Sequence, residues 1–185
     1  MKQIKKIYTR KMILCALFAA LTAVCSQISL PLPFTPVPVN LATLSVIMAG
    51  TLLGAKSGAL SQCVYLLAGA VGLPVFSRFS GGLGILIGAT GGYLVGYPIA
   101  ALLTGYFCKK LHTFRIGSAL AMAAGILICY AIGTLWYIIL THTPPIGALL
   151  ACVIPFLPCD ALKIAAALFL TKALSGKVPS LSTLL

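Results

Sequence analysis

The chain has 185 residues, of which 61% are hydrophobic and only 8% are charged, and its mean hydropathy is +1.12. Soluble globular domains contain roughly 45–50% apolar and about 25% charged residues, so this composition excludes a soluble domain and indicates an integral membrane protein. The formal charge of +12 does not indicate nucleic-acid binding, because the Lys and Arg residues flank apolar runs and are not interleaved with aromatic residues.

Apolar runs separated by Pro, Gly and charged residues predict the membrane spans. A hydrocarbon core about 30 Å thick needs about 20 helical residues per crossing, which leaves room for six spans in this chain. We therefore expect an all-α membrane protein that forms a single integral domain over residues 1–185. The predicted spans cover residues 12–30, 41–54, 58–73, 84–108, 117–140 and 158–174, and a short helix covers residues 146–155.

The first predicted span follows five basic residues and contains several alanines. Ala16 and Ala20 are four residues apart, so they share one helix face and allow another helix to approach closely. Packing inside the protein and docking of a partner would both use such a face, and the spacing alone does not separate them.

Four prolines within eight residues follow the first span, in the segment 31–40. Because Pro lacks an N–H and its ring fixes φ, we expect an extended, stiff loop here instead of a helix or a paired strand. The loop is nevertheless apolar, with Leu32, Phe34 and Val37. This composition indicates that the loop folds back as a lid over a site.

Glycine shapes the middle of the chain. The segment 54–58 predicts a tight turn, and the Gly-rich segment 69–84 predicts a second loop, in which Arg78 is the only basic residue. No Gly-Lys-Ser/Thr motif follows a strand, so we predict no nucleotide-binding loop. Glycines recur every four residues in the fourth span and give it a flat face for helix contact or for a ligand ring, at Gly84, Gly88, Gly92 and Gly96.

Basic residues set the orientation of the predicted spans. Segments on the cytoplasmic side are enriched in Lys and Arg. The start of the sixth span, the segment 31–40 and Arg78 then fall towards the outer face, which predicts cytoplasmic termini and a ligand pocket in the outer half. Eleven of the thirteen basic residues lie on the predicted inner side: Lys2, Lys5, Lys6, Arg10, Lys11, Lys56, Lys109, Lys110, Arg115, Lys172 and Lys177.

The sixth span carries the only acidic residue of the chain, Asp160. Lys163 follows three residues later, so the two side chains share one helix face. A charge inside a membrane helix costs about 2.5–3.5 kcal/mol on insertion scales, which indicates a functional role for the pair. The alternative is a satisfied ion pair that only locks the helix.

Metal and catalytic sites are not predicted. The seven cysteines lie in or beside apolar runs and form no Cys-x-x-Cys pair, and neither His112 nor His142 has the sequence context of a metal ligand or a base. No Ser/His or Cys/His pair lies at a common depth, so we expect no enzyme.

Motifs spread over about residues 12–175 form a specific set: Pro36-Val37-Pro38-Val39-Asn40-Leu41, Gly54-Ala55-Lys56-Ser57-Gly58-Ala59-Leu60-Ser61, Gly72-Leu73-Pro74-Val75-Phe76, Thr90-Gly91-Gly92-Tyr93-Leu94 and Pro155-x-x-Pro158-x-Asp160-x-x-Lys163. Together they resemble the BioY family, the biotin-binding S components of energy-coupling factor (ECF) transporters. The chain departs from the family pattern at Ala42, where Gln is common, and at Cys159, where Gly is common.

The resemblance implies a multi-pass protein of the bacterial cytoplasmic membrane that binds biotin with high affinity for uptake. Its partners would be a membrane-embedded coupling subunit of the EcfT type and two ABC-type ATPase subunits, so ATP is used by the partners and this chain needs no cofactor. Asp160 would accept hydrogen bonds from the ureido N–H groups, and Lys163 would neutralise Asp160 and donate to a ligand oxygen. The implied ligand-binding residues are Asp160, Lys163, Asn40, Thr43, Arg78, Gly84, Tyr93, Phe34 and Phe76, and the implied docking residues are Ala16 and Ala20.

A stand-alone secondary transporter is the other function class that the residues allow. It would use Asp160 as a proton-coupling carboxylate for a small solute. Internal repeats, which are typical of such transporters, are not evident in the sequence.

Overall fold

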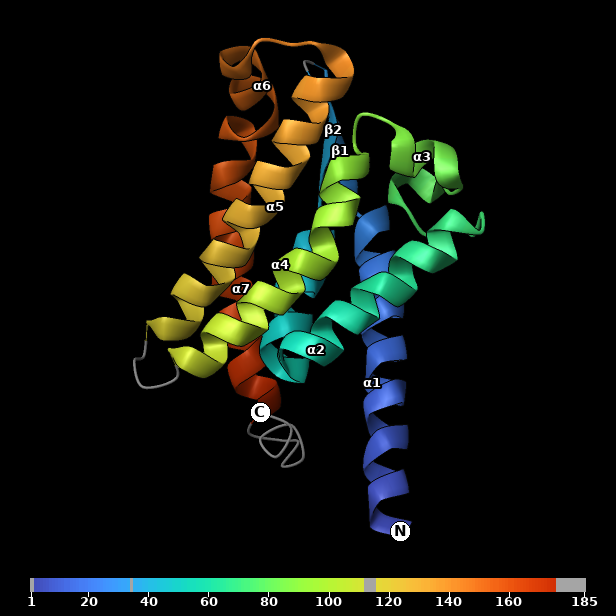
Figure 1. Ribbon diagram of the computed structural model, residues 1–185. Helices are drawn as coiled ribbons and strands as arrows, with labels where there is room; N and C mark the ends of the chain where they lie inside the picture. Colours follow the sequence, from blue (N-terminus) through green and yellow to red (C-terminus); the bar gives the residue numbers. More distant parts are fainter. Residues whose placement is uncertain (1, 34, 112–115, 176–185) are drawn as a thin grey trace.

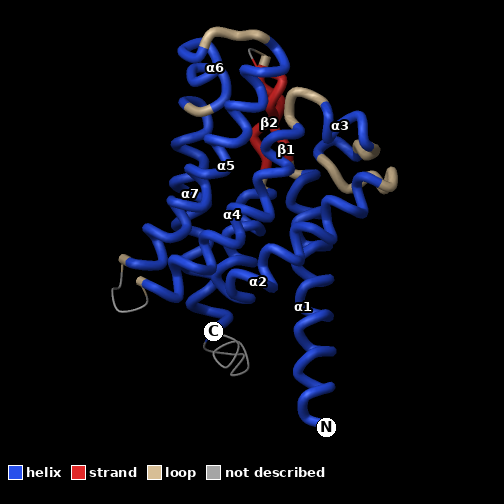
Figure 2. Tube along the Cα trace, viewed as in Figure 1, coloured by secondary structure: helices blue, strands red, loops and turns tan. Residues whose placement is uncertain are grey.

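The computed structural model describes residues 2–33, 35–111 and 116–175, and most of this chain is helical (Figures 1 and 2). In chain order the elements are α1 (Lys2–Gln27), β1 (Ser29–Leu32), β2 (Thr35–Asn40), α2 (Ala42–Ala70), α3 (Leu83–Ile87), α4 (Gly91–Lys110), α5 (Gly117–Thr141), α6 (Pro145–Cys152) and α7 (Leu157–Ser175), with 3-10 turns at Ser77–Phe79 and Ile154–Phe156.

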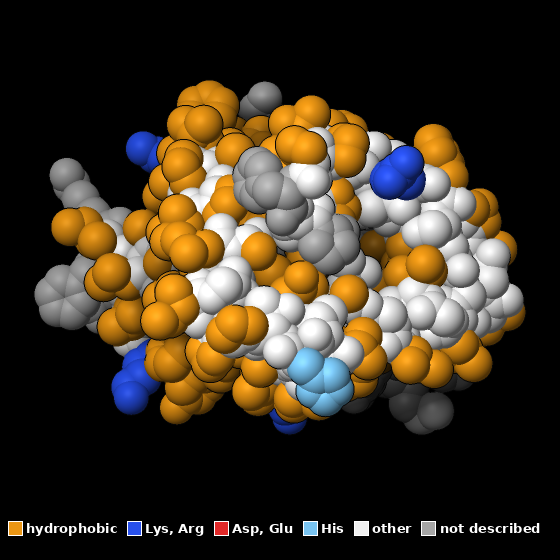
Figure 3. All heavy atoms as spheres, turned by 90° about the horizontal axis from the view of Figure 1, so that it is seen from above, with side chains coloured by type: hydrophobic (Ala, Val, Ile, Leu, Met, Phe, Trp, Pro, Cys, Tyr) orange, Lys and Arg blue, Asp and Glu red, His pale blue; other side chains and the backbone are white. Residues whose placement is uncertain are grey.

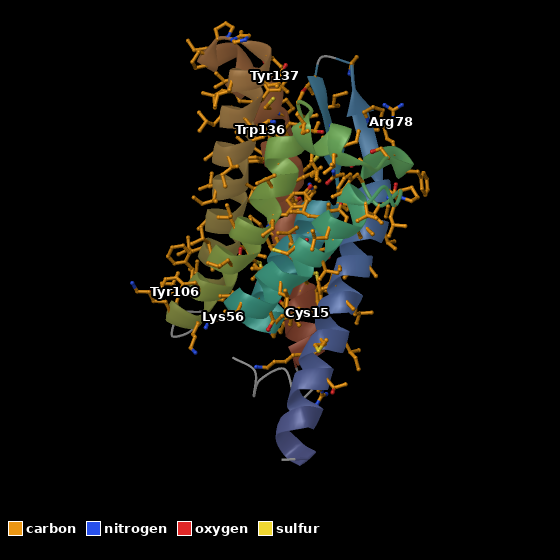
Figure 4. The ribbon with its side chains drawn as sticks, turned by 45° about the vertical axis from the view of Figure 1, so that its right-hand side comes forward. Cys15, Lys56, Arg78, Tyr106, Trp136 and Tyr137 are labelled. Carbon is orange, nitrogen blue, oxygen red and sulfur yellow. The ribbon has the colours of Figure 1, made fainter. Side chains whose placement is uncertain are left out.

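The long helices alternate in direction. α1 runs from the N-terminus to the β1–β2 hairpin, the two halves of α2 run back and forth, and α4, α5 and α7 continue the alternation (Figure 1). The start of α1 and the end of α7 therefore lie at one end of the molecule, which we call the terminal end. The hairpin, α3 and α6 lie at the opposite end, called the hairpin end. Lys56 and Tyr106 lie towards the terminal end, whereas Arg78, Trp136 and Tyr137 lie towards the hairpin end (Figure 4).

Glycines at a break and at a helix crossing shape the centre of the bundle. Gly54 has φ 78° and ψ 173° and divides α2 into two halves. Gly readily adopts positive φ, so the predicted tight turn over 54–58 is reduced to a break at this one residue, and the helix resumes beyond it. Beside the break α4 crosses α2, where a Cβ on Gly105 would lie 2.3 Å from the nitrogen of Ala55.

The proline-rich segment 31–40 is not the unpaired loop that we expected. Strands β1 and β2 pair in an antiparallel hairpin, with Ser29 opposite Asn40 and Leu30 opposite Val39, and the register is irregular around Pro31. A two-stranded hairpin leaves one edge of each strand unpaired, so a proline whose nitrogen faces outward removes no ladder hydrogen bond. The prolines therefore stiffen a paired ribbon.

The predicted fourth span is interrupted. α3 ends at Ile87, and α4 begins only at Gly91. The indole nitrogen of Trp136 on α5 donates a hydrogen bond to the carbonyl of Gly88 in the intervening turn, at 3.0 Å. Of the four glycines that recur every four residues, Gly92 packs against Trp136 and Gly96 against Cys129. The four glycines therefore do not lie on one continuous helix as predicted, but the two on α4 serve helix contact, which is one of the two expected uses.

The ends of the other helices differ from the predicted spans by a few residues or more. α1 begins at Lys2 because Lys and Arg are good helix formers, so the helix continues through the basic segment before the apolar run. α6 covers Pro145–Cys152, and α7 begins at Leu157 with Pro158 in its first turn, where its missing N–H has no helical partner to lose.

Several helices have the length and the apolar composition of membrane-spanning segments. Among the described residues, four helical segments are long and apolar enough to cross one: Thr9–Gln27, Ala42–Ala70, Gly117–Thr141 and Pro145–Leu174. Large apolar side chains lie exposed along the helices, among them Leu17, Leu67, Leu127 and Phe169. Apolar side chains also dominate the view onto the hairpin end, where no acidic side chain is visible (Figure 3).

Candidate ligand-binding pocket

A cavity of about 570 Å³ lies at the hairpin end, between the hairpin, the segment 76–80 and helices α2, α4, α5 and α7. This volume falls within the range of roughly 300–1,000 Å³ that is typical of small-molecule sites. Its wall has three parts: a buried ion pair, an aromatic side and a polar mouth.

The ion pair consists of Asp160 and Lys163 on α7. The Lys163 Nζ lies 2.6 Å from the Asp160 Oδ1, and both side chains are buried. Lys163 also donates to the hydroxyl of Thr43 at 3.0 Å, and the Tyr130 hydroxyl donates to Asp160 Oδ2. Both charged groups thus face the pocket with partners already in place, which a buried charge requires.

The sequence creates this arrangement at the start of two helices. Asp160 stands in the first turn of α7, where the helix dipole favours a negative charge, and the spacing of three brings Lys163 onto the same face. Thr43 stands in the first turn of α2. Just before it, Asn40 Oδ1 accepts a hydrogen bond from the N–H of Ala42 at 3.1 Å.

Aromatic rings from α4 and from the segment before α3 form the second part of the wall. Tyr93 and Tyr97 stand four residues apart on α4, and both line the cavity. The Tyr93 hydroxyl donates to the carbonyl of Cys152 at 3.1 Å, which ties α4 to α6. Tyr97 stacks on Tyr65, and Tyr65 meets Phe76 edge to face with ring centroids 5.5 Å apart. These contacts fix the aromatic wall before any ligand enters.

The mouth is formed by the hairpin and the segment 76–80. Asn40 Nδ2 donates to the Ser77 hydroxyl at 2.9 Å and so joins the two. Arg78 lines the cavity and is exposed at the surface. Asp160, the only acidic residue of the chain, pairs with Lys163, so Arg78 has no acidic side chain left to pair with. Its guanidinium is available to an anionic group on a ligand.

The structure brings most of the predicted ligand-binding residues into this one wall. Gly84 is not among the lining residues; its neighbour Ile85 is. Phe34 lies outside the described residues. Phe76 is 1% exposed, so its ring is already part of the core without a ligand. The predicted residues that line the cavity are Asp160, Lys163, Asn40, Thr43, Arg78, Tyr93 and Phe76.

Several lining residues were not predicted from the sequence. Tyr97 repeats Tyr93 at helical spacing, and Tyr130 places a polar tip in the middle of an apolar span, so both carried a usable signal. Among the others are ordinary apolar or small polar residues whose sequence context gives no signal: Thr35, Thr90, Leu94, Ile126, Cys129 and Phe156.

The alanine pair on α1 faces away from the bundle. Ala16 and Ala20 are exposed, whereas Cys15, Phe18 and Ala19 on the other side of α1 are buried. Within the described residues, no helix packs on the Ala16–Ala20 face.

The membrane-length helices and the pocket with its charged pair define a multi-pass membrane protein with a site for a small molecule. The chain belongs to the BioY family, whose family model matches residues 1–180. The resemblance seen in the motifs is therefore confirmed.

Named relatives and a solved structure agree with this assignment. A probable biotin transporter BioY of Pyrococcus horikoshii is 39% identical over 163 residues, which cover 88% of this chain and 94% of the relative. The biotin transporter BioY of Rhizobium etli is 35% identical over 184 residues, which cover 94% of this chain and 97% of the relative. A crystal structure of the S component for biotin from an ECF-type ABC transporter aligns with a TM-score of 0.85 at 26% identity, over 91% of this chain and 92% of that one. These relatives place the chain among transporters and not among enzymes.

Proposed function

We propose that this chain binds biotin with high affinity and mediates its uptake as the substrate-specific S component of an ATP-driven ECF transporter. The relatives named as biotin transporters and the fold shared with a biotin S component support the substrate. The observation that carries the proposal is the buried Asp160–Lys163 pair in the wall of a cavity of suitable size.

The charged wall suits the ureido ring of biotin. The ring has two N–H donors and one carbonyl acceptor, so it needs an acceptor and a donor side by side. Asp160 supplies the acceptor, and Lys163 supplies the donor 2.6 Å away from it. Tyr130 and Thr43, which bond to Asp160 without ligand, would turn towards the ligand or share the carboxylate with it.

The remaining wall suits the rest of the molecule. Tyr93 and Tyr97 offer ring faces to the fused bicycle and the aliphatic tail. Arg78 at the mouth would meet the carboxylate at the end of the tail, because a guanidinium binds a carboxylate through two parallel hydrogen bonds. A single orientation of biotin, with the ureido ring inward and the carboxylate outward, follows from these assignments.

We further propose six crossings of the bacterial cytoplasmic membrane, with both termini in the cytoplasm and the pocket in the outer half. The alternating directions of α1, the two halves of α2, α4, α5 and α7 support six crossings (Figure 1). Lys56 lies towards the terminal end, which supports the orientation because short cytoplasmic segments are enriched in Lys and Arg (Figure 4).

Docking to a membrane-embedded coupling subunit of the EcfT type, with two ABC-type ATPases behind it, belongs to the same proposal. The exposed Ala16–Ala20 face supports it. Lipid gives helices no hydrophobic reason to associate, so contact depends on the close backbone approach that small residues allow.

Titration calorimetry of the purified chain with biotin tests the substrate, and uptake into vesicles with and without the ATPase module tests the transport mode. We expect saturable binding by the isolated chain and uptake that requires ATP. Absence of biotin binding would refute the proposal. Uptake driven by a proton gradient without ATPases would favour the stand-alone transporter that uses Asp160.

A further inference from the structure

The segment 75–79 is held in place by the end of α1. Gln27 Nε2 lies 3.2 Å from the Val75 carbonyl oxygen and 3.1 Å from that of Phe76, while Gln27 Oε1 accepts a hydrogen bond from the Phe79 N–H at 2.8 Å. The Ser26 hydroxyl donates to the Val75 carbonyl at 2.6 Å. One side-chain amide thus donates to and accepts from the same short segment, as a neighbouring strand would.

This segment needs such support because its backbone is in an unfavourable conformation. Arg78 has φ 62° and Phe79 has φ 54°, two consecutive left-handed residues that are not glycine. In any residue other than glycine, a left-handed conformation brings the Cβ too close to the following carbonyl oxygen and is therefore strained. Gln27 accepts from the N–H of the second left-handed residue, so its hydrogen bond exists only while the turn is in this form.

The same segment supplies the mouth of the pocket. Ser77, Arg78 and Ser80 line the cavity, and the Phe76 N–H donates to the Ser80 carbonyl at 2.9 Å to close the turn. Gln27 does not line the cavity. If the turn relaxed, Ser77 and Arg78 would leave their places beside the hairpin although no lining residue had changed.

We propose that Gln27 is a positioning residue for ligand binding, which holds the 75–79 segment in its left-handed turn and thereby keeps Arg78 at the mouth of the pocket. This inference rests on the proposed function, because the ligand used to test it is biotin. Loss of the Gln27 hydrogen bonds should let the mouth of the pocket open and biotin dissociate faster, while the rest of the pocket wall stays intact.

The test compares biotin dissociation rates from the purified full chain. Gln27→Met keeps the length and shape of the side chain but removes its hydrogen bonds. We expect about tenfold faster dissociation, which corresponds to about 1.4 kcal/mol, and little change in the association rate. Val24→Ala is the matched control, since Val24 lies one turn earlier on α1, is 62% exposed and should leave both rates unchanged.

A rescue separates positioning from a general loss of structure. Phe79→Gly in the Gln27→Met background lets residue 79 adopt positive φ without strain, and Phe79 is 73% exposed, so little packing is lost. We expect dissociation to return to within about threefold of the wild type, given the strain that glycine relieves. An unchanged rate in Gln27→Met, or a fast rate that Phe79→Gly does not slow, would overturn the inference.

Hydrogen exchange of the wild-type chain tests the hold without any variant, should Gln27→Met fail to fold. The Phe79 amide should be protected in the absence of biotin, because Gln27 accepts its hydrogen bond. Rapid exchange of this amide would overturn the inference. A wild-type chain that binds no biotin would instead refute the proposed function, and the exchange of Phe79 would still decide about Gln27.

Discussion

Lys163 Nζ lies 2.6 Å from Asp160 Oδ1, one helical turn apart on α7, and both side chains are buried in the wall of the pocket. An ion pair keeps this part of the membrane helix neutral overall, and the hydrogen bonds from Tyr130 and Thr43 complete the coordination of the carboxylate. A ligand with two N–H donors meets an acceptor that is already oriented.

Replacement of the carboxylate should weaken biotin binding. Asp160→Asn exchanges an ionised acceptor for a neutral one and leaves Lys163 unpaired, so we expect a loss of about 1–3 kcal/mol in binding free energy by titration calorimetry. Leu162→Ala, on the lipid-facing side of the same helix with 72% exposure, should bind as the wild type does. Wild-type affinity in Asp160→Asn would contradict the assigned role.

Arg78 should discriminate between charged and neutral tails. Arg78→Gln removes the cation at the mouth, so it should weaken the binding of biotin by about 1–2 kcal/mol, the lower end applying because the site is exposed. Biotin amide, which has no carboxylate, should bind the variant and the wild type alike. Equal losses for both ligands would show that Arg78 does not contact the carboxylate.

The exposed alanine face of α1 should be needed for transport and not for binding. Ala16→Trp combined with Ala20→Trp blocks close helix approach, so energised uptake and co-purification of ATPase subunits should be lost. Biotin binding by the isolated variant should remain, since neither residue lines the pocket. Leu120→Trp combined with Leu135→Trp is the matched control, because both leucines are exposed on α5. Normal transport by the variant that carries Ala16→Trp and Ala20→Trp would place the docking surface elsewhere.

The crossing of α2 and α4 should not tolerate a methyl group. A Cβ on Gly105 would lie 2.3 Å from the Ala55 nitrogen, so Gly105→Ala should lower the free energy of unfolding by about 1–3 kcal/mol, measured by thermal unfolding in detergent. Gly84→Ala is the control, because a Cβ there meets nothing within 4 Å. Equal stability of both variants would mean that the two helices readily move apart.

Biotin should order the hairpin. Asn40 joins β2 to Ser77 across the mouth, so a ligand beneath this contact should slow amide exchange in the hairpin, measured by hydrogen-exchange mass spectrometry. Asn40→Ala should reduce the slowing. The same exchange with and without biotin would show that the hairpin is a fixed wall and no lid.

Local sequence determined the parts of this protein that depend on near neighbours along the chain. The membrane class follows from composition, and the shared face of Asp160 and Lys163 follows from a spacing of three in a helix. The break in α2 was visible as Gly54, since glycine readily adopts its backbone angles. The sequence motifs were sufficient to identify the BioY family.

The paired hairpin and the broken fourth helix were not foreseen. Both errors came from applying a local sequence rule without knowing which distant segment contacts the residues concerned. A proline excludes a ladder bond only on the edge that is paired, and which edge is paired depends on the neighbouring strand. The turn at Gly88 is stabilised by Trp136, 48 residues away, which a helical glycine pattern does not reveal.

Tertiary structure alone decided which residues surround the charged pair and what holds the mouth. Tyr130 reaches Asp160 across 30 residues, Lys163 reaches Thr43 across 120, and Gln27 reaches the Phe76 carbonyl across 49. Such contacts depend on how the helices cross, and the crossings depend on packing summed over many side chains, so no single spacing along the chain encodes them.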